Sequence, residues 1–238
     1  GIDLAGQGGM VWIKNRDQND NNWLFANSLG IGNPMRSNSD GEKFGLGNNG
    51  ISAFNSNGFT VGASDSVNAS GEDIVSWTFR NSKAFQCLTY AGNATNRTIS
   101  HSLGSVPGLI MIKCTSDSST SWRVYHRAIG NGKWLKLDGS DSADTDSTVW
   151  NNTDPTSTEF TLGTNGFVNG NSSTFVAYLF AGGESTADTA RSVDLDGSGD
   201  YFTTSTSSDY TFGTGDFTVE HWIKINGSTS GQPTLLDA

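Results

Sequence analysis

Apolar positions along this chain recur with the two-residue period of β-strands. Residues 74–79 and 133–137 alternate apolar and polar side chains, and the short apolar run at residues 58–62 is bracketed by glycines. Such runs, bounded by turns rich in Gly, Asn and Asp, indicate half-buried strands. No segment keeps the 3.6-residue apolar period of a helix. We therefore predict an all-β protein with very little helix.

A unit of about one hundred residues occurs twice in the chain. Residues 10–14 (Met-Val-Trp-Ile-Lys) align with residues 109–113 (Leu-Ile-Met-Ile-Lys), and residues 75–79 align with residues 176–180. The offset is 99 at the start of the unit and 101 at its end. A period of this length is too long for a solenoid repeat and indicates tandem small β domains.

Two further strands, at residues 85–90 and 97–101, are predicted to open the second unit. Repeat 2 then spans residues 83–181. Repeat 1 spans residues 1–82 and is expected to lack its opening strand. Both repeats are predicted to be antiparallel, jelly-roll-like β-sandwiches. The small, polar, Gly-rich residues 182–191 have the composition of a linker.

The segment after the linker, residues 192–238, resembles the start of a laminin-G-like, concanavalin-A-like domain. The resemblance rests on residues 195–201 (Leu-Asp-Gly-Ser-Gly-Asp-Tyr) and on residues 212–222, which begin Phe-Gly-Thr-Gly-Asp-Phe. His221 departs from the pattern, which commonly has a small residue there. The resemblance implies a jelly roll whose C-terminal strands are missing, since its last strands pair with its first.

The two repeats resemble modules of tail-fibre and other virion proteins of marine phages. The matching segments are residues 9–16, 54–59, 75–79 and 125–127. The resemblance implies a virion-surface, extracellular appendage protein with a structural or receptor-binding role. It also implies other virion proteins as partners, host surface polysaccharide as a receptor, and a homotrimer.

The composition favours a folded, acidic protein. Hydrophobic residues make up 34% and charged residues 16% of the 238 residues, but 7 Trp, 13 Phe and 5 Tyr argue against disorder. The net charge of −10 disfavours nucleic acid and anionic lipid partners. No apolar run approaches the roughly 18 residues that a membrane-spanning helix needs, so we expect no membrane insertion.

The two cysteines, Cys87 and Cys114, lie in different predicted strands. We expect two free, half-buried thiols, because two cysteines seldom meet the geometry of a disulfide by chance. A bridge between them remains the alternative.

The sequence shows no catalytic constellation. The three histidines are His101, which lies between two serines, His126 and His221, and all three are interpreted as structural because no Gly-x-Ser-x-Gly elbow is present. Glycosidases use paired carboxylates, whereas the last predicted strand offers Glu220 alone. We therefore expect a protein that is not an enzyme.

Two acidic segments are candidates for metal binding. Asp194, Asp196 and Asp200 resemble a calcium loop, although the Glu that closes an EF-hand loop is absent. A glycine turn with solvent-facing aspartates is the competing interpretation, so we expect no cofactor, with a calcium ion as the one candidate. The second segment is the acidic loop of repeat 2, interpreted as solvated: Asp138, Asp141, Asp144 and Asp146.

Tryptophan rings could stack on a sugar. The tryptophans considered are Trp12, Trp77, Trp122, Trp134, Trp150 and Trp222. Trp12 and Trp77 sit at matched strand positions of the repeat, which indicates core packing. Trp150 is nearer to a predicted loop and is the candidate glycan-binding residue.

These observations lead to one main hypothesis and two alternatives. The main hypothesis is a non-enzymatic phage appendage protein that serves as a spacer, a receptor-binding protein, or both. The alternatives are a secreted bacterial adhesin and the non-catalytic, carbohydrate-binding part of a polysaccharide-active enzyme.

Overall fold

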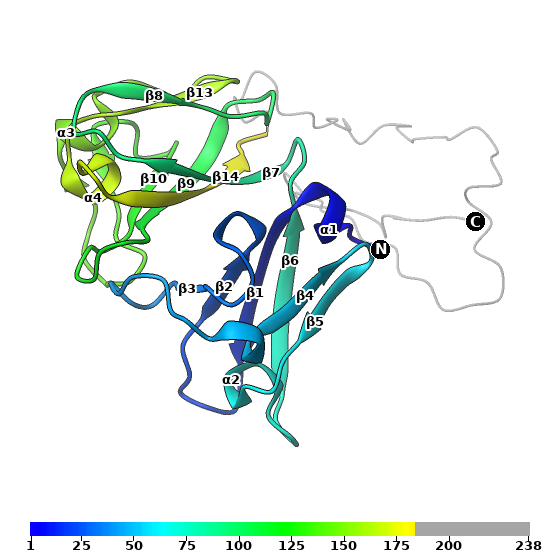
Figure 1. The fold of residues 1–238 in the computed structure, drawn as a ribbon. Coiled ribbons are helices and arrows are strands. Elements are labelled where there is room, and N and C mark those ends of the chain that lie inside the picture. The colour runs from blue at the N-terminus through cyan, green and yellow to red at the C-terminus, as the bar shows by residue number, and fades with distance from the viewer. Residues whose placement is uncertain (184–238) are drawn as a thin grey trace, which may run out of the picture. The chain divides into compact units, whose positions relative to one another are not determined.

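Strands and turns make up nearly all of residues 1–183, the part of the chain that the computed structural model describes (Figure 1). The α-helices there have four residues each: α1 (Leu4–Gln7), α2 (Asp65–Asn68), α3 (Ser147–Trp150) and α4 (Gly166–Asn169). Two 3-10 turns, η1 (Asn27–Leu29) and η2 (Gly47–Asn49), complete the helical part. The predicted all-β class is confirmed, and none of these helices is long and apolar enough to cross a membrane.

Some sequence predictions lie outside the described residues. These are the C-terminal part of the linker, the laminin-G-like segment at residues 192–238, and the metal candidates Asp194, Asp196 and Asp200.

Repeat 1 is built on a four-stranded antiparallel sheet with the order β3-β2-β1-β6. Its strands are β1 (Gly9–Asn15), β2 (Trp23–Ala26), β3 (Met35–Arg36) and β6 (Ile74–Arg80). A separate hairpin pairs β4 (Ile51–Asn55) with β5 (Gly58–Val61). Gly9 begins β1 with a φ of +149°, and a Cβ there would lie 2.1 Å from the carbonyl oxygen of Phe79, so this position requires glycine.

Repeat 2 is built on a matching antiparallel sheet with the order β10-β9-β14-β7. Its strands are β7 (Phe85–Ala91), β9 (Pro107–Cys114), β10 (Arg123–His126) and β14 (Thr174–Ala181). Two short pairs accompany it: β8 (Arg97–Ser100) with β13 (Glu159–Leu162), and β11 (Lys133–Trp134) with β12 (Asp144–Thr145).

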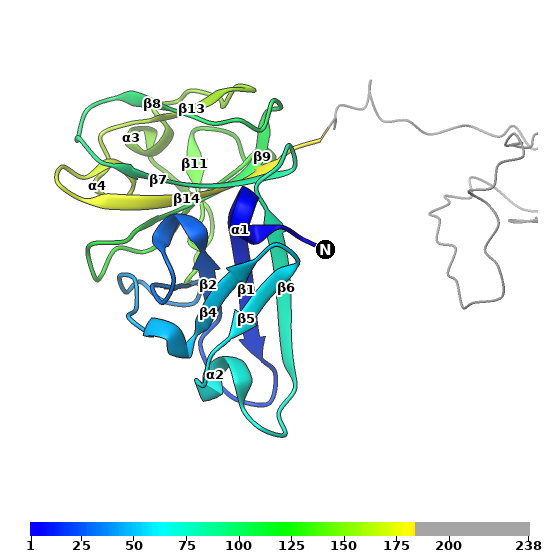
Figure 2. The same ribbon diagram turned by 45° about the vertical axis from the view of Figure 1, so that its right-hand side comes forward.

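Three apolar cores lie between these layers, and the middle one belongs to both repeats. Core 1, between the large sheet of repeat 2 and the β8–β13 pair, comprises Ile99, Leu103, Ile110, Ile112, Cys114, Tyr125, Val149, Trp150, Phe160, Leu162, Val168, Phe175, Ala177 and Leu179. Core 2, between the two large sheets, comprises Met10, Leu24, Ala26, Met35, Phe85, Cys87, Met111, Trp122, Val124, Val176 and Tyr178. Core 3, beneath the β4–β5 hairpin, comprises Leu4, Val11, Ile13, Trp23, Phe25, Ile51 and Val67. Figures 1 and 2 show this order of layers.

The central strands are therefore apolar on both faces. In β14, Phe175, Ala177 and Leu179 face core 1, whereas Val176 and Tyr178 face core 2. Successive side chains of a strand point to opposite faces, so a strand between two cores reads as a continuous apolar run. This accounts for the run Phe-Val-Ala-Tyr-Leu-Phe at residues 175–180.

Both cysteines are free thiols, and they lie on opposite faces of one sheet. Cys87 is in core 2 and Cys114 is in core 1, so the two sulfur atoms cannot bridge within this fold. Both are fully buried rather than half-buried. Burial raises the pKa of the Cys87 thiol to about 12, although its hydrogen bond with Ser28, at 2.9 Å, acts to lower it.

Candidate functional site

An open hollow of about 300 Å³ lies beside the β11–β12 pair of repeat 2. Its lining combines one aromatic ring with charged and small polar groups: Trp134, Lys136, Asp141, Ser142, Ala143 and Asp144. The acidic loop after β11 supplies most of the rim. β11 supplies the ring, which its pairing with β12 places opposite Asp144.

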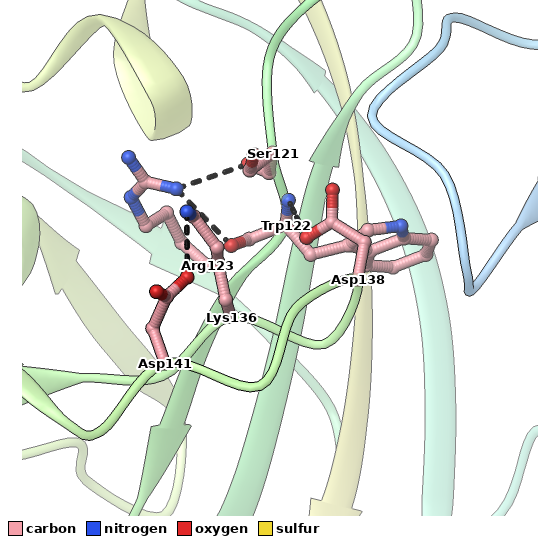
Figure 3. A network of polar contacts seen from close by, with 6 residues as sticks. All are labelled: Ser121, Trp122, Arg123, Lys136, Asp138 and Asp141. Atoms are coloured by element: carbon pink, nitrogen blue, oxygen red, sulfur yellow. Dashed lines mark hydrogen bonds and ion pairs between the residues drawn. The ribbon is translucent and has the colours of Figure 1, made fainter.

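The Trp134 ring is held in place by a buried arginine. The guanidinium carbon of Arg123 lies 3.8 Å from the centroid of the Trp134 ring and 3.9 Å from that of Phe167, so the cation is sandwiched between two aromatic rings. Arg123 Nη1 donates to the carbonyl oxygens of Ser121 and Trp122, at 3.3 and 3.2 Å (Figure 3). Arg123 is only 6% exposed. These contacts fix one face of the indole.

Carboxylates nearby balance the buried charge without touching it. Burial lowers the pKa of Arg123, and the charges of Asp138, Asp146 and Asp144 act in the opposite direction. Lys136 and Asp141 form an exposed ion pair at 2.8 Å (Figure 3). The hydrogen bond between them lowers the pKa of Asp141 and raises that of Lys136.

The carboxylates of the acidic loop serve separate donors. Asp138 accepts from the backbone N–H of Trp122 at 3.2 Å, and Asp144 accepts from the N–H of Thr145 at 2.8 Å. Asp146 caps α3 and also accepts from Asn165 Nδ2 at 2.9 Å. Within residues 1–183 no group of three or more His, Cys, Asp or Glu side chains is placed to hold a metal ion.

Trp150, the sequence candidate for sugar stacking, belongs to core 1. It ends α3, is 2% exposed, and meets Tyr125 edge to face with a centroid separation of 5.9 Å. Its indole N–H donates to the carbonyl oxygen of Lys133 at 3.0 Å. The ring therefore presents no open face to a ligand. Trp134, another of the tryptophans considered for sugar stacking, lines the hollow instead.

The two described histidines lie apart from the hollow. His101 is buried, and its Nδ1 accepts from the N–H of Leu103 at 3.4 Å. Burial lowers the pKa of His101. His126 is exposed, and its Nδ1 accepts from the N–H of Ala128 at 3.2 Å. Neither lines the hollow, and Glu220 and His221 lie outside the described residues.

A second open hollow, of about 350 Å³, lies where the two repeats meet. It is lined by Ser28, Leu29, Lys43, Thr89, Tyr90, Ala91, Thr115, Thr174 and Phe175. Its hydroxyl groups largely bond to protein: those of Thr115 and Thr174 lie 2.7 Å apart, and that of Tyr90 donates to the carbonyl oxygen of Val168 at 2.8 Å. The Trp134 hollow is the better candidate because its ring is held by Arg123 and its lining adds the carboxylates of Asp141 and Asp144 and the hydroxyl of Ser142.

The Arg123 stack is the part of this site that sequence reasoning missed. Arg123 lies in β10 and Trp134 in the next strand, β11, whereas Phe167 comes from the more distant α4. No motif joins them, so the only available signal was the aromatic character of the rings themselves.

Comparison with known proteins identifies the family but no characterised relative. A family model described as a domain of unknown function, DUF7483, matches residues 2–189. The chain belongs to this family, and the match runs through both repeats. Neither the curated proteins nor the solved structures gave a match.

Proposed function

We propose that this DUF7483 protein is a non-enzymatic part of a phage virion appendage, and that it binds host surface glycan through the Trp134 hollow. The observation that carries the glycan proposal is the Trp134 ring, fixed from one side by Arg123 and lining an open hollow with polar groups around it. The virion setting rests on the resemblance of residues 9–16 and 125–127 to marine-phage appendage modules. Other virion proteins and a homotrimeric assembly belong to the same proposal.

The chemistry of the hollow suits a sugar. An aromatic side chain offers an apolar face and costs little conformational entropy to order. Binding sites combine such rings with a few polar groups that fix orientation, and here Ser142, Asp141 and Asp144 can exchange hydrogen bonds with hydroxyls. The carboxylates of Asp141 and Asp144, together with the net charge of −10, favour a neutral or amino sugar over an anionic one.

The non-enzymatic assignment draws on how the carboxylates are used. A glycosidase needs one carboxyl group kept protonated and a second that acts as nucleophile or base. The ion pair with Lys136 lowers the pKa of Asp141, which favours its charged form. No described histidine lies at the rim to replace the missing acid.

A glycan array probed with the full chain tests this function. We expect binding to neutral or amino-sugar oligosaccharides, and about a tenfold or greater loss of affinity for Trp134→Ala. Ser142→Ala and Asp144→Asn should weaken binding by smaller factors. Trp77→Ala is the matched control, because Trp77 is 49% exposed but lies outside the hollow.

Circular dichroism and thermal melts of each variant separate lost binding from lost folding. Absence of glycan binding by the folded chain would contradict the proposal, as would undiminished binding by folded Trp134→Ala. Release of new reducing ends from a bound glycan would contradict the non-enzymatic assignment.

A further inference from the structure

Repeat 1 has an open strand edge at a place where repeat 2 has a paired one. In repeat 2, β14 pairs with β9 on one edge and with β7 on the other. Its counterpart in repeat 1, β6, pairs with β1. Among residues 1–183 no strand pairs with the other edge of β6.

A second open edge lies on β5. The counterpart of β5 in repeat 2 is β13, which pairs with β8. The N–H of Gly163, at the end of β13, donates to the carbonyl oxygen of Val149, whereas the N–H of His101 donates to that of Thr158. Positions 158 and 163 differ in parity, and successive residues of a strand direct their backbone groups to opposite edges. β8 therefore lies on the edge of β13 that faces away from Val149.

The partner of β5 occupies the other edge. The N–H of Gly62, the counterpart of Gly163, donates to the carbonyl oxygen of Gly50, and β4 continues directly from Gly50. β4 thus pairs with the edge of β5 that corresponds to the Val149 edge of β13 in repeat 2. The edge corresponding to the β8 side is open in the described part of repeat 1, and Phe59 and Val61 direct their N–H groups toward it.

The apolar side chains along this gap are incompletely covered. Phe160 and Leu162 of β13 are 1% and 0% exposed, because core 1 closes around them. Their counterparts Phe59 and Val61 are only partly buried at the margin of core 3. The difference matches the absence, in repeat 1, of strands corresponding to β7 and β8.

An asparagine that occurs in both repeats has fewer hydrogen-bond partners in repeat 1. Asn169 Nδ2 donates to the carbonyl oxygens of Gly163 and Thr95, and its Oδ1 accepts from the N–H of Asn93 in the β7–β8 turn. Asn68, its counterpart, keeps the bond to the carbonyl oxygen of Gly62 at 2.9 Å, and the rest of its side chain is exposed. Asn169 thus holds the β7–β8 turn in repeat 2, whereas Asn68 has no corresponding turn to bind in the described part of repeat 1.

Gly1 lies beside the open edge of β5. By the offset of 99, Leu4 corresponds to Leu103, and each is buried in the core of its own repeat. Gly1 then corresponds to Ser100, the last residue of β8. A Cβ on Gly1 would lie 2.9 Å from the Cα of Asn57, next to β5, just as Ser100 pairs with Glu159 of β13.

We propose that the open edges of β5 and β6 together bind a β-hairpin built like β7–β8, which enters beside Gly1. The hairpin would add one strand to each edge by main-chain hydrogen bonds, cover Phe59 and Val61, and give Asn68 its missing partners. A hairpin linked directly before Gly1 is favoured over the β7–β8 hairpin of a second copy. It has a high effective concentration, whereas the β7–β8 hairpin of a second copy is already paired within its own repeat.

The test adds a copy of residues 83–99 directly before Gly1 of the full chain and measures amide hydrogen exchange. The bonds from Arg16 N–H to Asp73 O and from Asn81 N–H to Gly8 O place the odd-numbered groups of β6 toward β1. The N–H groups of Ser76 and Thr78 therefore point to the open edge. We expect their exchange, and that of Phe59 and Val61, to slow by about tenfold or more. The amides of Trp77 and Phe79, already directed at β1, should change less.

Two controls sharpen this experiment. An Ile99→Asp change confined to the added copy should abolish the extra protection, because the matching residue in repeat 2 is buried in core 1. Asn68→Ala should reduce the protection in the extended chain and have little effect in the chain without the extension.

Two results would overturn the proposal. One is unchanged exchange at Ser76 and Thr78 in an extended chain that is folded. The other is protection of these amides in the unextended chain that rises with protein concentration together with dimer formation in sedimentation, which would make a second copy the occupant.

Discussion

Lys14 and Lys113 are matched residues that close the same loop in both repeats. Lys14 Nζ donates to the carbonyl oxygens of Asn15 and Gln18, the latter at 2.8 Å. Lys113 Nζ donates to the carbonyl oxygen of Cys114 at 3.0 Å and to Thr120 Oγ1 at 3.2 Å. Lys113 is fully buried, and this desolvation lowers its pKa. At both sites the amine supplies hydrogen bonds to a turn that follows a buried strand.

His101 should make stability depend on pH. Burial holds the pKa of folded His101 below its ordinary value of 6.5, so the unfolded chain binds more protons over the intervening range. Above about pH 7 His101 is neutral in both the folded and the unfolded chain, so it makes no pH-dependent contribution to stability there. As the pH drops through 6.5, the unfolded chain takes up the proton first, and the free energy of unfolding falls. Urea unfolding at pH 7.5 and 5.5 should show a smaller loss for His101→Gln than for the parent chain.

His126→Gln is the matched control for this prediction, because His126 is exposed. It should keep the parent dependence on pH. Equal losses for both variants between pH 7.5 and 5.5 would contradict a role for His101.

At the scale of elements, α3 links the acidic loop to core 1. Asp146 precedes the helix and accepts from the N–H of Thr148 at 2.8 Å and from its hydroxyl at 2.6 Å. Burial raises the pKa of Asp146, but these hydrogen bonds, that from Asn165 and the charge of Arg123 outweigh it, so the pKa is lowered overall. The cap sets the start of a helix that ends on the buried Trp150.

Asp146→Ala should destabilise the fold by about 0.5–2 kcal/mol, the usual cost of losing a helix N-cap. Asp144→Ala is the matched control, since Asp144 is exposed and bonds to the N–H of its own neighbour. Chemical denaturation of both variants measures the difference. A larger effect for Asp144→Ala would show that the cap is not what holds α3.

The sequence was sufficient for several of the longer strands, but it missed β4 and did not show which core each strand face contacts. Alternation at residues 133–137 predicted the strand that carries Trp134, and the polar turn before residue 97 separated β7 from β8. Two-sided burial of β14 was not predictable, because it depends on which sheets stack. Trp150 was placed near a loop, since a four-residue helix shows no period. The Arg123 stack joins β10, β11 and the more distant α4, and no sequence motif encodes such a contact.

At the scale of the whole described region, contacts through core 2 join the two repeats. The indole N–H of Trp122 donates to the carbonyl oxygen of Arg36 at 3.0 Å, and Ser28 bonds to Cys87. Met10, Leu24 and Met35 of repeat 1 complete the same core. Removing either repeat would expose an apolar sheet face, so residues 1–183 should fold and unfold as one cooperative unit.

Leu162→Ala tests this cooperativity from a distance. Leu162 is fully buried in core 1, and core 2 separates it from the sheet of repeat 1. The variant should lose about 2–5 kcal/mol in the free energy of unfolding. If both repeats unfold together, the slowest-exchanging amides of β1 in repeat 1 should lose as much protection as those of β9 in repeat 2. Thr161→Ala on the same strand, directed away from core 1, is the matched control. Faster exchange confined to β9 and its neighbours, with β1 unaffected, would show that the two repeats unfold independently despite their shared core.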